Sequence, residues 1–107
     1  MTDFRDRERG EESKFAMDAQ TAFRVAARRN RLLGHWAAEK MGLSPEETEA
    51  YAKAVIQADF EEAGDEDVIR KVLGDLTGAG VDIDEAGVRA ALEEKNVEAK
   101  RQLMSES

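Results

Sequence analysis

Arg28, Arg29 and Arg31 lie within one expected helical turn and form the densest group of potential ligand-binding side chains in this chain. A guanidinium presents five N–H donors in a planar fork, which suits carboxylates and phosphates. The cluster is therefore suited to three uses: ion pairs with acidic side chains of the same chain, binding of a phosphate, or docking on an acidic partner. The spacing alone does not choose among them.

The only histidine, His35, directly precedes the only tryptophan, Trp36. Catalysis by histidine needs a nucleophile or a second base nearby, and no sequence pattern signals one. We therefore interpret His35 as a structural residue near a helix C-terminus. Trp36 is expected to be largely buried, because its indole offers more apolar area than any other side chain here.

Asp82, Asp84, Gly87 and Glu93 match positions 1, 3, 6 and 12 of a calcium-binding loop. Position 5 is Ala86, whose side chain has no oxygen ligand. The same residues also fit a helix start, with an aspartate N-cap and acidic residues in the first turn, where the helix dipole favours them. We therefore predict a helix start here and no metal site.

The composition bounds the class of protein. The 107 residues suit one domain. Residues 1–31 carry a net charge of +2 and residues 32–107 a net charge of −10, which together give −8. An acidic body argues against a nucleic-acid partner, because such binding depends on neutralising phosphates. Cysteine is absent, no apolar run approaches the roughly 20 residues that span a bilayer, and the N-terminus lacks a secretory signal. We expect no direct membrane insertion.

Helix-favouring residues dominate the sequence and proline occurs once, which predicts an all-α fold. Ser44, Pro45 and Glu47 form the pattern of a capping box with proline at the first helical position. Gly42 is expected to end the preceding helix as its C′ residue. We predict helices over residues 11–41, 45–64 and 66–76, and from Asp82 or Asp84 to residue 103. Short connections between them favour a compact antiparallel four-helix bundle.

Apolar residues at helical spacing are expected to face the core of this bundle. They are Phe15, Ala19, Ala22, Phe23, Ala26, Leu33 and Ala37 in the first helix, Tyr51, Val55, Ala58 and Glu62 in the second, Val68, Val72, Leu73 and Leu76 in the third, and Val88, Leu92, Ala99 and Leu103 in the fourth.

Residues 1–14 are expected to form a mobile arm, and residues 15–107 the bundle. Nine of the twelve residues from 3 to 14 are charged, and Phe4 is the only large hydrophobe among them. Such a segment cannot bury enough apolar surface to order itself. Charges of both signs with sparse apolar side chains suit a segment that folds inside a partner's groove.

Four sequence blocks resemble one known family, the ζ subunits of α-proteobacterial ATP synthases, which inhibit F1-ATPase. The blocks are DRE (6–8), KFA (14–16), ARRNRLLG (27–34) and WAAE (36–39). The resemblance covers essentially the whole chain and is densest over residues 4–42. It implies a four-helix fold whose N-terminal segment enters a catalytic α/β interface of F1 and stops rotation in the direction of hydrolysis.

The resemblance also implies partners and site residues. The partners would be the α and β subunits and the central stalk of F1, and the protein would be a non-enzymatic, cytoplasmic monomer that associates through F1 with the inner-membrane ATP synthase. The inhibitory arm would comprise Phe4, Arg5, Asp6, Arg7, Glu8, Arg9, Glu11, Lys14 and Phe15. The alternative function is a small nucleotide-sensing domain that binds ADP or ATP weakly through Arg28, Arg29 and Arg31; no other cofactor is expected.

Overall fold

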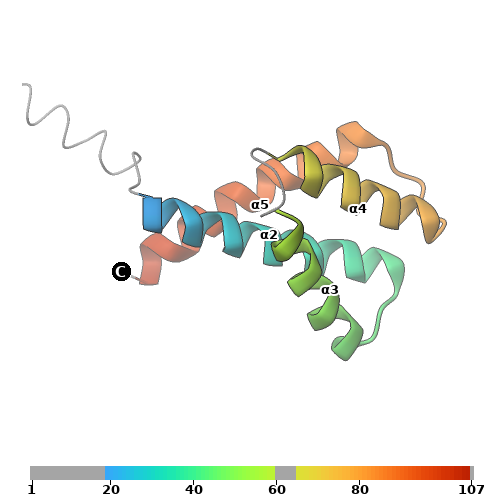
Figure 1. Ribbon diagram of the computed structural model, residues 1–107, viewed down its shortest axis with the longest axis horizontal. Coiled ribbons are helices and arrows are strands. Elements are labelled where there is room, and N and C mark those ends of the chain that lie inside the picture. Colours follow the sequence, from blue (N-terminus) through green and yellow to red (C-terminus); the bar gives the residue numbers. More distant parts are fainter. Residues whose placement is uncertain (1–18, 60–64, 107) are drawn as a thin grey trace, which may run out of the picture.

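The computed structural model describes residues 19–59 and 65–106, which form four helices and contain no strand (Figure 1). The helices are α2 (Ala19–Met41), α3 (Pro45–Ala58), α4 (Glu66–Gly78) and α5 (Glu85–Glu106). This arrangement confirms the all-α four-helix fold. The predicted arm over residues 1–14, and the core positions Phe15 and Glu62, lie outside the described residues.

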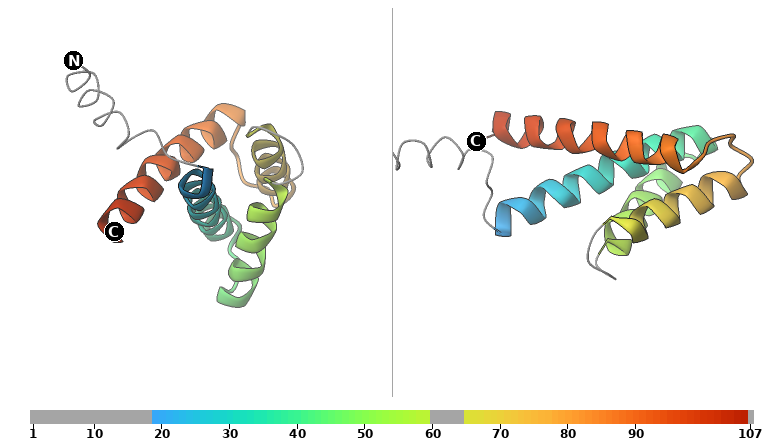
Figure 2. Two further views of the ribbon diagram at one scale, coloured as in Figure 1. Left: turned by 60° about the vertical axis from the view of Figure 1, so that its left-hand side comes forward. Right: turned by 90° about the horizontal axis from the view of Figure 1, so that it is seen from above.

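Helix α2 is the central element of the fold. It contacts each of the other three described helices, and α4 also contacts α3 and α5. Figures 1 and 2 show α5 running antiparallel to α2 on one side, with α3 on the other side. The amphipathic faces of the helices therefore meet around α2.

Local sequence signals set the ends of α2 and α3 as predicted. The backbone N–H of Glu47 donates to Ser44 Oγ at 3.1 Å, and the Ser44 N–H donates to Glu47 Oε1 at 2.8 Å, which completes the capping box. Gly42 has a positive φ of 76° and the Leu43 N–H donates to the Ala38 carbonyl at 3.0 Å. This pairing satisfies a terminal carbonyl of α2 in the Schellman manner.

One apolar cluster fills the space between the helices. Seven predicted core positions of α3, α4 and α5 are confirmed as buried: Val55, Val68, Val72, Leu76, Val88, Leu92 and Ala99. Leu33 and Ala37 of α2 are also buried as predicted, whereas Tyr51, Ala58, Leu73 and Leu103 are only partly buried.

The predicted core face is wrong in the N-terminal half of α2. Ala19, Ala22 and Phe23 are exposed, and Phe23 has an exposed fraction of 54%. The buried face instead continues backwards from Leu33 in steps of four residues, through Arg29 to Val25. Apolar spacing does not predict that Arg29 is buried, because a guanidinium is rarely buried unless carboxylates are close to it.

Three helix ends also differ from the prediction. Helix α3 ends at Ala58 rather than residue 64, and the Asp59 N–H donates to the Ile56 carbonyl at 3.2 Å. Helix α4 continues to Gly78. Two residues later, a second positive-φ glycine, Gly80, has a φ of 85° and ends the helix. Helix α5 extends to Glu106, three residues past its predicted end.

Helices α2 and α3 approach most closely at Gly34. A Cβ atom at this position would lie 2.8 Å from the Cα atom of Ala52 and 3.2 Å from its Cβ atom. Only a hydrogen at Gly34 and a methyl group at Ala52 permit this spacing of the two backbones. The Gly34 position therefore determines how α3 is seated on the central helix.

Replacing Gly34 with alanine is expected to lower the free energy of unfolding by about 1–3 kcal/mol, because the added methyl must push the two backbones apart. Chemical denaturation measures the change. The matched control is Gly74→Ala in α4, where nothing lies within 4 Å of the added Cβ. That change is expected to stabilise by about 0.5–1 kcal/mol through helix propensity. Equal stabilisation by both substitutions would contradict the close approach.

Candidate functional site

The three clustered arginines of α2 point toward different helices. Arg28 Nη1 lies 2.8 Å from Glu106 Oε2 at the end of α5, and Arg31 Nη2 lies 3.0 Å from Glu49 Oε2 in α3. The Glu106 ion pair raises the pKa of Arg28 mainly through the hydrogen bond, and the same bond lowers the pKa of Glu106. The cluster is therefore a set of separate ion pairs and does not converge on one site.

Arg29 is buried, with an exposed fraction of 8%. Its Nη1 atom lies 3.1 Å from Asp65 Oδ1 and its Nη2 atom 3.4 Å from Asp59 Oδ2, while Nε donates to Asn30 Oδ1 at 3.0 Å. Asp59 follows the last residue of α3, and Asp65 precedes the first residue of α4. Arg29 therefore joins the central helix to the end of one helix and the start of the next.

Of the three uses open to the cluster, the structure displays ion pairing within the chain. No sequence pattern signals Asn30, Asp59 and Asp65 as partners of Arg29, because these contacts depend on how the helices pack. A nucleotide phosphate at Arg28, Arg29 and Arg31 would have to displace carboxylates from all three. ADP or ATP binding at this cluster stays a prediction.

Replacing Arg29 with methionine is expected to destabilise the fold by about 3 kcal/mol, because it leaves Asp59 without its buried counter-charge. Thermal or chemical unfolding monitored by circular dichroism measures this loss. The matched control is Arg31→Met, two residues along the same helix, whose ion pair is nearly half exposed. Its cost is expected to be at most about 1 kcal/mol. Equal losses in the two variants would rule out a special role for Arg29.

His35 lies beside the Arg31–Glu49 ion pair. Its Nε2 atom is 3.4 Å from Glu49 Oε2 and makes no hydrogen bond to any described residue, although the side chain as a whole is 40% exposed. A position beside a surface ion pair fits the structural interpretation of His35.

Trp36 packs against the apolar core but is only partly buried. Lys40, one turn later in α2, places its Nζ atom 5.2 Å from the centre of the indole ring, within the range of a cation–π contact. Trp36 and His35 line an open groove with Lys95 of α5. The expected burial of Trp36 therefore holds for the face toward the core and not for the whole ring.

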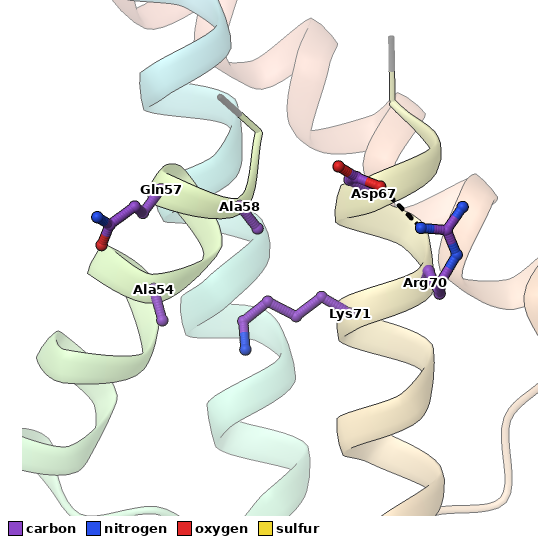
Figure 3. Close-up of a pocket in the computed structure, with 6 residues that line it drawn as sticks. All are labelled: Ala54, Gln57, Ala58, Asp67, Arg70 and Lys71. Carbon is purple, nitrogen blue, oxygen red and sulfur yellow. Dashed lines mark hydrogen bonds and ion pairs between the residues drawn. The ribbon is translucent and has the colours of Figure 1, made fainter. Parts of the chain in front are cut away.

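A second open cleft lies between α3 and α4 (Figure 3). Its lining residues are Ala54, Gln57, Ala58, Asp67, Arg70 and Lys71. Both of its cations have acidic partners in their own helix: Arg70 Nη1 is 2.7 Å from Asp67 Oδ1, and Lys71 Nζ is 3.1 Å from Asp75 Oδ2. These pairs offset the positive charge that an anionic ligand would need in the cleft.

Lys71 reaches from α4 toward α3 (Figure 3), and its Nζ atom lies 5.2 Å from the centre of the Tyr51 ring. The Tyr51 hydroxyl donates to Asp75 Oδ2 at 2.8 Å. The pKa of Tyr51 is raised above its ordinary value. Burial is the largest cause, and the hydrogen bond to Asp75 and the negative charge of Asp75 add to it. The neutral phenol is therefore the form that the fold stabilises.

Because the Tyr51 pKa is raised by folding, stability is expected to fall as the pH rises above about 10, where the unfolded chain ionises and the folded chain does not. This is the only tyrosine, so phenolate absorbance reports it alone. The absorbance is expected to rise only as the protein unfolds. Tyr51→Phe should make the alkaline loss of stability less steep. A folded protein that gains phenolate absorbance near pH 10 would contradict the burial argument.

Asp84 directly precedes α5 and caps its N-terminus. Its Oδ1 atom accepts a hydrogen bond from the Gly87 N–H at 2.9 Å, as an N-cap residue does. Across residues 19–59 and 65–106, no group of three or more histidine, aspartate or glutamate side chains is placed to hold a metal ion. The calcium-like spacing is thus explained by helix capping.

Comparison with known proteins defines the class of this chain. The family model described as ATPase inhibitor subunit zeta matches residues 1–102. The chain is therefore a regulatory protein, an inhibitor of an ATPase, and not an enzyme. It belongs to the ATPase inhibitor subunit zeta family.

One solved structure, described only as a solution NMR structure, is similar to this chain. The two are 55% identical in sequence with a TM-score of 0.70, over 79% of this chain and 96% of the other. No curated protein matches the chain. None of the helices in the described part is long and apolar enough to cross a membrane.

Proposed function

We propose that this chain inhibits ATP hydrolysis by the F1 part of ATP synthase by inserting residues 1–14 at a catalytic α/β interface. The arm then blocks rotation of the central stalk in the direction of hydrolysis, and the helical body anchors it. The protein acts in the cytoplasm, as a monomer, on F1 attached to the inner membrane.

The observation that carries this proposal is the extent of the family match, which begins at residue 1 and so includes the arm. The arm has the composition of a segment that orders only against a partner, with nine charged residues among the twelve from 3 to 14. Phe4 and Phe15 supply apolar anchors at its two ends. The surrounding charges suit a polar cleft between subunits.

The ion pairs of the body support the same division of roles. Arg28, Arg29 and Arg31 are each engaged by a carboxylate of the chain itself. They stabilise the packing of α2 against the other helices. The arm carries three further arginines, Arg5, Arg7 and Arg9, which alternate with Asp6 and Glu8, and we assign these to F1.

Deleting residues 2–14 is expected to abolish inhibition of purified F1-ATPase and to leave the melting temperature of the body unchanged. The reason is that the deleted segment contains one large hydrophobe and contributes little to any core. Steady-state ATP hydrolysis with increasing inhibitor, together with thermal unfolding, measures the two effects.

The control is a full-length variant in which residues 2–14 are permuted, so that length and net charge are kept while Phe4 and the charges change register. It is expected to inhibit far less than the natural sequence. A truncated protein that inhibits as well as the full chain would show that the body is the effector and would overturn the proposal.

The nucleotide-sensing alternative is tested in the same preparation. Adding ADP or ATP while amide chemical shifts are recorded separates the two functions. Saturable shifts around Arg28, Arg29 and Arg31, in a protein that does not inhibit F1, would favour nucleotide sensing.

A further inference from the structure

The outer face of α5 carries two exposed hydrophobes near its C-terminal end. Val97 is 51% exposed and Met104 is 61% exposed. They are seven residues apart, so they lie on one face of the helix. Lys100 and Arg101 lie between them, and the four side chains line a shallow hollow together with Ser105.

Within residues 19–59 and 65–106, the two cations of this face have no counter-charge. Among the described residues, the side chains of Lys100 and Arg101 make neither an ion pair nor a hydrogen bond. Acidic residues outnumber basic ones by 24 to 16 in this chain, and Arg28, Arg29 and Arg31 all have acidic partners. Two neighbouring cations beside exposed hydrophobes are therefore available to carboxylates of another molecule.

This face belongs to the end of α5 that packs beside the first half of α2. Arg28 Nη1 donates to Gln102 Oε1 at 2.9 Å and to Glu106 Oε2 at 2.8 Å, so the last turns of α5 lie beside the first half of α2 (Figure 1). Helix α2 begins, among the described residues, at Ala19, five residues after the arm. The first described turns of α2 and the last turns of α5 therefore lie at the same end of the body (Figure 1).

We propose that Val97, Lys100, Arg101 and Met104 form a second F1-binding face, which contacts an apolar surface of F1 bordered by carboxylates. The proposal rests on the proposed function, because the partner is the F1 that receives the arm. Two linked contacts bind more tightly than either alone, since the first holds the second at a high effective concentration. Contacts of α5 thereby increase the affinity for F1, whereas the arm stops its rotation.

The acidic residues of the same helix limit the extent of this face. Glu93 and Glu94 lie one turn before Val97 and are exposed. They repel a carboxylate-bearing partner and confine its contact to the last three turns of α5. Binding of this partner therefore depends on the local positive charge of Lys100 and Arg101, although the whole chain has a net charge of −8.

The test uses the full-length chain and purified F1-ATPase. The double variant Lys100→Glu with Arg101→Glu is expected to raise the concentration for half-maximal inhibition about tenfold, because attraction becomes repulsion. Inhibition at saturation should stay complete, because the arm is intact. Higher salt should weaken inhibition by the natural protein, since the charges are exposed. The half-maximal concentrations of the natural protein and the double variant should then lie closer together.

The matched control compares Lys100→Glu with Lys53→Glu. Both lysines are exposed and lack a side-chain ion pair among the described residues, and both changes alter the net charge equally. The Lys53 variant, on α3, is expected to inhibit like the natural protein. Circular dichroism of each variant verifies that the helices are retained.

The outcomes separate this inference from the proposed function. A natural protein that fails to inhibit F1 overturns both. A natural protein that inhibits, with a double variant effective at the same concentrations, overturns only the second face. If sedimentation shows a dimer of the natural chain that the double variant cannot form, the face serves a second copy of the chain and the inference is wrong.

Discussion

The contact on which the rest of the structure depends is the seating of α3 against α2. Gly34 brings the two backbones together at Ala52, and five residues earlier Arg29 reaches the end of α3 and the start of α4. The first is a steric constraint and the second an electrostatic one. Together they position the end of α3 and the start of α4 against α2, and α4 contributes Val68, Ile69, Val72 and Leu76 to the apolar cluster.

Charge is used in two distinct ways along this chain. In the body, the basic turn of α2 is neutralised by carboxylates from three different parts of the fold, which stabilises a small core with few large side chains. In the arm and on the outer face of α5, we assign the positive charges to a partner. A local cationic face at Lys100 and Arg101 on an acidic chain suits an inhibitor that approaches its partner in one orientation.

We assign folding to the helical body and inhibition to the arm, and this separation of roles suits a short inhibitor chain. Among the described residues, the four helices share one buried apolar cluster, and the deletion of residues 2–14 tests whether the body folds without the arm. In the proposed mechanism, contacts with F1 supply the free energy that orders the arm, because ordering each residue costs about 1–2 kcal/mol. A second contact through α5 would offset part of that cost and hold the arm at the interface.

The sequence by itself determined the features that depend on neighbouring residues. The all-helical class, the Ser44–Glu47 capping box, the helix end at Gly42 and the core faces of α4 and α5 all follow from local spacing and backbone preference. The family resemblance, carried by residues 6–39, was also available from the sequence and is confirmed.

Only the tertiary structure decided which side of α2 is buried and what its arginines contact. Arg29 is buried because Asp59 and Asp65, 30 and 36 positions away, neutralise it, and helical spacing carries no information about such distant partners. The same holds for α5, where the exposure of Val97 and Met104 depends on how the helix is rotated against its neighbours. Burial and charge pairing depend on how the helices pack, and packing is a property of the whole fold.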